Sequence, residues 1–382
     1  MTLELIDRKY GPLLFYAALI MVLVSTSWFW VSNMPGLAVR LSRNMFDVAK
    51  VLCCLRIALF SWRYPRYVIA CFAVLSVLYV SSRLSHSTLL FKTAMLVAAA
   101  RDTNMRVVLR IYLVVFLSLL VVAPLTTAIG WTSDIVKHKH NLVGHSFGLY
   151  NPNRYAFLLQ MLAMLVILVF RIRRFVWIWL ISWASALVVG LLTLSTTSVI
   201  VLLFFPIVYF LLKLQIPSAR WQAALPFALV LLSIGLAAYF GPSKGASTFE
   251  SRFSIPYLIF EGRGLSWLGQ EYGLITWGQA FREGIEPLYM NNLFLRIIVQ
   301  DGVIVALLVF ALYAHYLYRM TLRGNRLLLA MVVCVAISGL MQLYALIITL
   351  DFLLLYYFQQ SSSGSDVSKS SSEAQERRPS KD

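Results

Sequence analysis

Long apolar runs recur along this chain, and they restrict it to folds built from membrane-spanning helices. A helix needs about 20 mostly apolar residues to cross the hydrocarbon core of a bilayer, and ten runs approach or reach that length. They occupy residues 13–31, 48–62, 67–82, 88–100, 107–130, 154–170, 175–194, 196–212, 223–240 and 302–318. Strands of a membrane barrel alternate polar and apolar residues in short segments. These unbroken runs therefore predict helices.

The last apolar stretch, 326–358, is too long for one upright helix, and we divide it around 338–342. With this division, the sequence predicts an all-α polytopic membrane protein, a bundle of about 12 transmembrane helices. Residues 1–358 then form one transmembrane domain. The final segment, 359–382, contains nine serines and charges of both signs, which is typical of a disordered tail.

Composition supports the membrane assignment. Hydrophobic residues make up 60% of the chain and charged residues 13%, whereas soluble domains have about 45–50% and about 25%. The net charge of +17 would suggest a nucleic-acid partner in a soluble protein. Here most basic residues lie between the apolar runs, as topology signals and lipid contacts do. We therefore expect membrane lipids, and no nucleic acid, as partners.

Charge also predicts an orientation. If the N-terminus is cytoplasmic, the inner connections hold more arginine and lysine than the short outer ones, as the positive-inside rule requires. Two long loops, 131–153 and 241–301, then lie on the outer face. The second exceeds the usual length of a structureless connection and carries ten aromatic residues. We expect it to be partly helical and to lie on the membrane.

Several cations are candidates for function. Arg56 lies near the middle of an apolar run, where a charge tends to face a polar cavity or a partner. Arg252 and Arg263 lie in the long outer loop, and a guanidinium fork matches phosphate oxygens. Alternatively, these arginines pair with nearby glutamates or with lipid headgroups.

The shorter outer loop contains three histidines, His138, His140 and His145, with Asp134 nearby. Imidazoles can ligate zinc, but there is no helical HExxH spacing, and we expect no metal. A solvated loop is the main alternative, and a proton-handling role for His145 is another. The chain has no phosphate-cradling GxxxxGK[ST] loop, so ATP-driven transport by this chain alone is not expected.

Three segments resemble motifs of the bacterial O-antigen ligase and polymerase superfamily. In 145–154, Asn-Pro-Asn stands at the start of a span. The segment from 251 to 270 begins with Ser-Arg and ends in a hydrophobic-Gly-Gln step, and 291–304 leads into a later span. The layout is most similar to Wzy-type repeat-unit polymerases of exopolysaccharide and capsule pathways. Two places depart from the pattern, because Asn291 replaces a common acid and 194–198 lacks an arginine.

The resemblance implies a membrane-embedded glycosyltransferase that needs neither metal nor cofactor. Its substrate would be an undecaprenyl-pyrophosphate-linked oligosaccharide, and it would polymerise these units on the outer face of the bacterial inner membrane. A flippase and a chain-length regulator would be its protein partners. Transfer of glycan to another acceptor, as an O-antigen ligase performs, is an alternative. A flippase or transporter of lipid-linked sugars is a second, although transporters concentrate charges in broken midplane helices.

Roles follow from this chemistry as hypotheses. Arg252 and Arg263 would hold the donor pyrophosphate, where negative charge develops. His145 or Glu250 would take the proton of the acceptor hydroxyl. Further substrate-binding candidates are Asn151, Asn153, Arg154, Asn292 and Arg56. For the Asn-Pro-Asn segment, a purely structural helix start is an equal alternative.

Overall fold

The computed structural model describes residues 3–27, 36–59, 64–139, 142–149, 151–215, 218–241, 250–273, 290–343, 352–353 and 355. Within these residues the chain is helical apart from turns, short connections and one two-stranded hairpin. The predicted helical class is thereby confirmed. The tail predicted at 359–382 lies outside the described residues.

Seven helices are long and apolar enough to cross a membrane. They are α3 (Pro65–Leu84), α5 (Met105–Ala128), α6 (Pro152–Val169), α7 (Phe175–Thr193), α8 (Thr196–Leu214), α9 (Ala219–Phe240) and α13 (Val303–Leu322). Shorter apolar helices are Tyr10–Ser25 within α1 (Leu3–Ser27), α4 (Leu89–Ala99) and α14 (Arg326–Ser338). The fold is therefore that of a multi-pass membrane protein, and the number twelve stays a prediction.

Helix α2 (Gly36–Leu59) begins well before the apolar run predicted at 48–62. Its polar first half has partners that keep it helical: Lys50 forms an ion pair with Asp47 one turn away. Lys92 of α4 lies over the ring of Phe46, 4.1 Å from its centroid. Hydropathy marks only the apolar part of such a helix, which is why the prediction started late.

The core lies where α1, α5, α6 and α8 meet. Large side chains from these helices, Phe15, Tyr112, Phe157 and Phe205, are completely buried there. A bilayer is as apolar as these side chains, so moving them out of lipid does not stabilise the bundle. Close packing without voids stabilises it instead. The connections at the ends of the bundle are therefore free to carry function.

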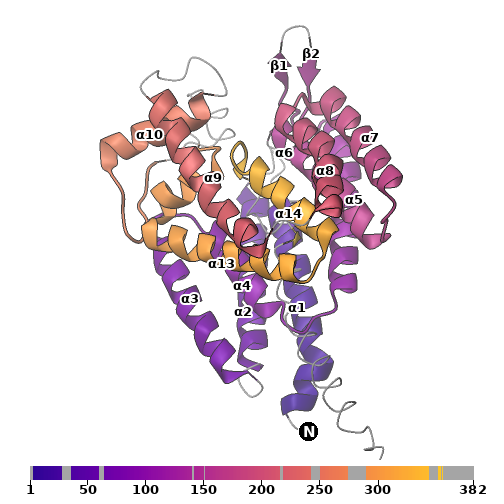
Figure 1. Ribbon diagram of the computed structural model, residues 1–382. Helices are drawn as coiled ribbons and strands as arrows, with labels where there is room; N and C mark the ends of the chain where they lie inside the picture. The colour runs from indigo at the N-terminus through magenta and orange to yellow at the C-terminus, as the bar shows by residue number, and fades with distance from the viewer. Residues whose placement is uncertain are drawn as a thin grey trace, which may run out of the picture.

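Successive spans alternate in direction, so the connections fall into two groups. The hairpin of β1 (Lys137–Lys139) and β2 (Leu142–Gly144) lies at one end, at the top of Figure 1, with the α7–α8 connection and the start of α10. We call this the hairpin end, and it corresponds to the predicted outer face. The α4–α5, α6–α7 and α13–α14 connections lie at the other end, which we call the arginine end.

The long loop is partly helical, as predicted. It contains α10 (Ser251–Arg263), α12 (Leu293–Arg296) and a π-helical turn, η3 (Ile297–Asp301). Gly302 follows η3 with φ +100°, and a Cβ there would lie 2.4 Å from the amide nitrogen of Gly269. Only glycine fits this contact. The 264–273 segment is thereby closed against the start of α13.

The last stretch divides as predicted, because α14 ends at Ser338. Beyond it, Gln342 Nε2 donates to Ser198 Oγ at the hairpin end of α8, at 3.5 Å. Phe352 instead packs against Tyr112, with ring centroids 5.9 Å apart. Tyr112 is roughly 10 Å along α5 from the arginine end. Residues 342 and 352 therefore lie at different depths in the bundle.

Candidate functional site

The hairpin end contains a close pair of titratable side chains. His145 Nδ1 and Asp134 Oδ2 are 2.5 Å apart. The side chain of His145 is 41% exposed and that of Asp134 is 22% exposed, so the pair can be reached by a ligand. A carboxylate on one imidazole nitrogen holds the ring and directs the other nitrogen outward. The pair is therefore equipped to accept a proton.

The backbone around the pair also holds the carboxylate. Asp134 Oδ1 accepts hydrogen bonds from the amides of Ser146 and Phe147, at 2.9 and 2.8 Å, and from Ser146 Oγ at 3.1 Å. Burial opposes ionisation of Asp134, but the hydrogen bonds from His145, Phe147 and Ser146 outweigh it and hold its pKa below the usual value. Asp134 is therefore a carboxylate at neutral pH.

The hairpin is fixed to the end of α7. The amide of His145 donates to the carbonyl oxygen of Leu192 at 2.8 Å. Gly144 lies so close to α7 that a Cβ would be 2.6 Å from the carbonyl oxygen of Thr193. Any larger residue would separate strand and helix. The position of His145 is thus set by a membrane-spanning helix.

Arg252 reaches the same place from α10. Its Nη1 donates to the carbonyl oxygen of Met341 at 2.8 Å and to Thr197 Oγ1 at 3.4 Å. Thr197 is in the first turn of α8, just after the short α7–α8 turn that follows Leu192. The structure therefore brings His145 and Arg252 to the two sides of the α7–α8 turn.

Buried polar atoms without partners lie at this turn as well. Ser195 Oγ and Gln342 Oε1 have no hydrogen-bond partner among the described residues. Such atoms are rare in folded proteins, and they mark a place for water or for a ligand hydroxyl. Sequence reasoning missed both residues. The polar run Ser195–Ser198 between two apolar helices was the signal that could have identified the turn.

Glu250, the second candidate base, is the residue before α10 and is partly buried. Its carbonyl oxygen accepts the amides of Phe253 and Ser254, both at 2.9 Å, so it contributes to the helix start. It lies two residues from Arg252 in the chain. The Asp134–His145 pair therefore remains the better supported of the two candidate bases.

Arg263 is at the opposite end of α10 from Arg252, roughly 16 Å away along the helix axis. Its Nη1 donates to the carbonyl oxygen of Glu271 at 2.9 Å, and its side chain is exposed. One pyrophosphate group cannot contact both arginines in this arrangement. The structure therefore separates the two residues to which we assigned a common role.

The Asn-Pro-Asn segment starts a helix. Asn151 Oδ1 accepts the amide of Asn153 at 2.8 Å, and Pro152 is the first residue of α6. This is the structural alternative considered for the motif. Arg154 is only 5% exposed, and Asn153 is partly buried. The segment adjoins the hairpin, so it frames the site from the side of α6.

Two further candidates are buried side chains. Asn292 is fully buried; its Oδ1 caps α12 through the amide of Leu295, and its Nδ2 donates to Ser233 Oγ. Arg56 is 1% exposed, and its Nη2 donates to the carbonyl oxygen of Arg101 at 3.2 Å, at the arginine end. The structure therefore places Arg56 in the packing of the α4–α5 connection and away from the hairpin-end site.

The structure describes only some of the histidines that were candidate zinc ligands. The side chain of His138 and all of His140 lie outside the described residues. Among the residues that are described, no group of three His, Cys, Asp or Glu side chains gathers to hold a metal ion. His145 is engaged with Asp134, which suits acid–base chemistry.

A second polar cluster was also missed. Asp301, 3% exposed, receives Ser81 Oγ at its carbonyl oxygen (2.9 Å) and Ser85 Oγ at Oδ1 (3.4 Å). Burial raises its pKa to about 6, against the lowering effects of Arg296, Ser85 and Ser87. The serine-rich end of α3 was the available signal. This cluster joins α3 to the closed 264–273 segment.

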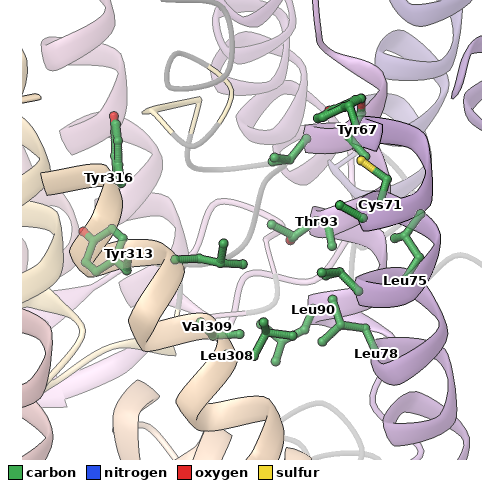
Figure 2. Close-up of a pocket in the computed structure, with 16 residues that line it drawn as sticks. Tyr67, Cys71, Leu75, Leu78, Leu90, Thr93, Leu308, Val309, Tyr313 and Tyr316 are labelled. Atoms are coloured by element: carbon green, nitrogen blue, oxygen red, sulfur yellow. The ribbon is translucent and has the colours of Figure 1, made fainter. Parts of the chain in front are cut away.

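An apolar groove of about 340 Å³ leads away from this cluster along α3, α4 and α13. Leu78, Leu90 and Leu308 line one part, and Tyr67, Tyr313 and Tyr316 line the other (Figure 2). All three tyrosine hydroxyls donate to backbone carbonyls. Only apolar ring surface therefore remains for a ligand.

Comparison with known proteins leaves the family open. No family model matches this chain, and no curated protein or solved structure matches it either. The likeness to the O-antigen ligase and polymerase superfamily rests on the three sequence motifs and stays a prediction.

Proposed function

We propose that this protein is a polysaccharide polymerase that joins oligosaccharide repeat units carried on undecaprenyl pyrophosphate. The observation that carries the proposal is the Asp134–His145 pair, fixed on one side of the α7–α8 turn, with Arg252 bound to the other side. A general base beside a fixed guanidinium is what transfer from a glycosyl pyrophosphate requires.

The reaction would proceed by displacement at the anomeric carbon of the donor. His145 Nε2 would take the proton of the acceptor hydroxyl as its oxygen bonds to that carbon. The bond from the carbon to the pyrophosphate oxygen would break, and the lipid pyrophosphate would leave with the electron pair. Asp134 would orient the imidazole and stabilise its protonated form. Arg252 would offset the charge that develops on the leaving group.

The membrane part of the proposal concerns the lipid. A polyprenyl chain is apolar, and the groove between α3, α4 and α13 offers it an apolar wall at the depth of the bilayer. We further propose twelve spans with the hairpin end facing the periplasm of a bacterial inner membrane. This orientation follows the distribution of arginines between the two ends.

The test is transfer by purified protein supplied with synthetic lipid-pyrophosphate repeat units, with products resolved by length. We expect a ladder of products from the wild type and none from Arg252→Ala or His145→Gln. Arg83→Ala and His86→Gln are matched controls, because both residues are exposed at the hairpin end and outside the site. They should keep the ladder.

Other outcomes separate the alternatives. A single product formed on a different glycan acceptor would assign the protein to the ligase class. Well-folded wild type that makes no product with its cognate repeat unit and any supplied acceptor would refute the glycosyltransferase proposal. Transport of labelled lipid-linked sugar across proteoliposomes would then be measured.

A further inference from the structure

The arginine end contains a large basic cavity that the proposed function does not use. Its volume is about 1080 Å³, and it lies between α5, α6, α8 and the start of α14. Five arginines line it: Arg106, Arg110, Arg171, Arg173 and Arg326. No aspartate or glutamate is among its lining residues. The cavity is therefore an open, positively charged hollow with exposed arginines on its wall.

The described residues supply no counter-charge at this cavity. Within the described residues, none of the five arginines forms an ion pair with a carboxylate. Arg106 and Arg110 are one turn apart on the same face of α5, where like charges repel. The N-termini of α5 and α14 add partial positive charge, because both helices begin at the cavity. Among the described residues, no carboxylate balances this charge.

Three of the lining residues have contacts or backbone geometry that order this end of the bundle. Arg326 Nη1 donates to the carbonyl oxygen of Lys213 at 3.0 Å. The carbonyl oxygen of Arg173 accepts the hydroxyl of Tyr209 at 3.5 Å. Arg171 has φ +54°, in the left-handed region where glycine usually ends a helix. The lining therefore belongs to an ordered part of the bundle.

We propose that this cavity binds a group carrying two or more phosphates. The planar fork of arginine matches phosphate oxygens, and five arginines around one cavity favour a polyphosphate over a single charge. The same chemistry is presented by a diphosphate lipid headgroup at the membrane surface and by a free polyphosphate. The cavity is at the opposite end of the bundle from His145 and Arg252, so this site is independent of the proposed glycosyl transfer.

Two binding measurements distinguish the sources. Calorimetric titration of the detergent-purified protein with inorganic tripolyphosphate tests a free ligand. Native mass spectrometry of the protein from phosphatidylcholine nanodiscs, with and without cardiolipin, tests a diphosphate lipid. The variant Arg171→Gln/Arg173→Gln removes two lining charges. The control Arg174→Gln/Arg220→Gln removes two exposed charges from the same end that do not line the cavity.

We expect saturable binding of one probe by the wild type, and binding at least about tenfold weaker in the lining variant. The control should stay within about twofold of the wild type. Equal losses in both variants, or no saturable binding of either probe, would overturn the proposal, since diffuse surface charge would then explain the arginines. If the lining variant has a lower melting temperature than the wild type, Arg326→Gln replaces it as the test. Binding by Arg326→Gln equal to that of the wild type would also overturn the proposal.

Discussion

Replacing Asp134 separates the structural and chemical roles that the structure gives to one carboxylate. The carboxylate accepts four hydrogen bonds, one from His145 at Oδ2 and three from Ser146 and Phe147 at Oδ1. Asp134→Asn keeps an oxygen for the two amides but presents an NH2 group to the imidazole. Asp134→Ala removes both functions. The two variants should therefore differ more in stability than in activity.

The magnitudes follow from those contacts. In Asp134→Ala the amides of Ser146 and Phe147 lose their acceptor, at about 1–3 kcal/mol for each buried group. Ser146 is fully buried, but the carboxylate site is partly open to water. We therefore expect a total loss of about 2–3 kcal/mol, and about 1 kcal/mol for Asp134→Asn. Both variants should lower turnover by at least about 100-fold, since the base is no longer oriented.

The assays are unfolding by denaturant in mixed micelles and glycosyl transfer at saturating substrate. The folded pKa of Asp134 lies below its ordinary value. Its stabilising effect is therefore complete above the unfolded pKa of about 3.9 and is lost as the pH falls through the folded pKa. The difference in free energy of unfolding between wild type and Asp134→Asn should therefore disappear as the pH falls from the unfolded pKa to the folded pKa of Asp134. Wild-type turnover in Asp134→Asn would refute the assignment of His145 as base, and unchanged stability in Asp134→Ala would refute the hydrogen-bond network.

Three further predictions concern other parts of the hairpin end. Arg252→Lys keeps the charge but loses the fork, so transfer should fall at least about tenfold with folding intact; unchanged kcat would contradict its role. Gly302→Ala should lower the free energy of unfolding by about 2 kcal/mol or more. Gly264 is also at positive φ but faces open space, so Gly264→Ala should lower it by only about 1 kcal/mol. Equal melting curves for the two variants would disprove the close contact at Gly302. Asp301→Asn should stabilise the protein more at pH 8 than at pH 5, because the raised pKa penalises the ionised wild type as the pH rises through about 6; a pH-independent difference in melting temperature would exclude that penalty.

Hydropathy predicted the helices well because burial in lipid selects composition directly, and seven of the described helices are long and apolar enough to cross a membrane. Every helix expected to cross the membrane up to 318 has a helical counterpart, and α14 ends where the last stretch was divided. The boundary of α2 was missed because its polar half is stabilised by partners on the same helix and on α4, which hydropathy does not report. The β1–β2 hairpin was missed because Lys-His-Lys lacks the β-branched and aromatic pattern of a strand.

The site was predictable only in part. Residue chemistry singled out His145 and Arg252, which the structure brings to one turn. Asp134 was noted beside the histidines, but its bond to His145 spans eleven residues of loop and depends on the fold. Arg263 shares the chemistry of Arg252, and only the geometry of α10 separates them. Sequence gives the type of a charged residue, whereas its distance from another is a property of packing.

The attachment of His145 and Arg252 to one turn bears on how this protein could diverge. His145 is bound to the end of α7 and Arg252 to the start of α8, so these helix ends set the spacing between the two residues. The length of the surface loops does not change it. Insertions or exchanges in those loops would then leave base and cation at the same spacing while reshaping what surrounds them. Under the proposed function, a lineage built on this frame acquires new acceptor sugars by loop replacement alone and keeps its chemical step unchanged.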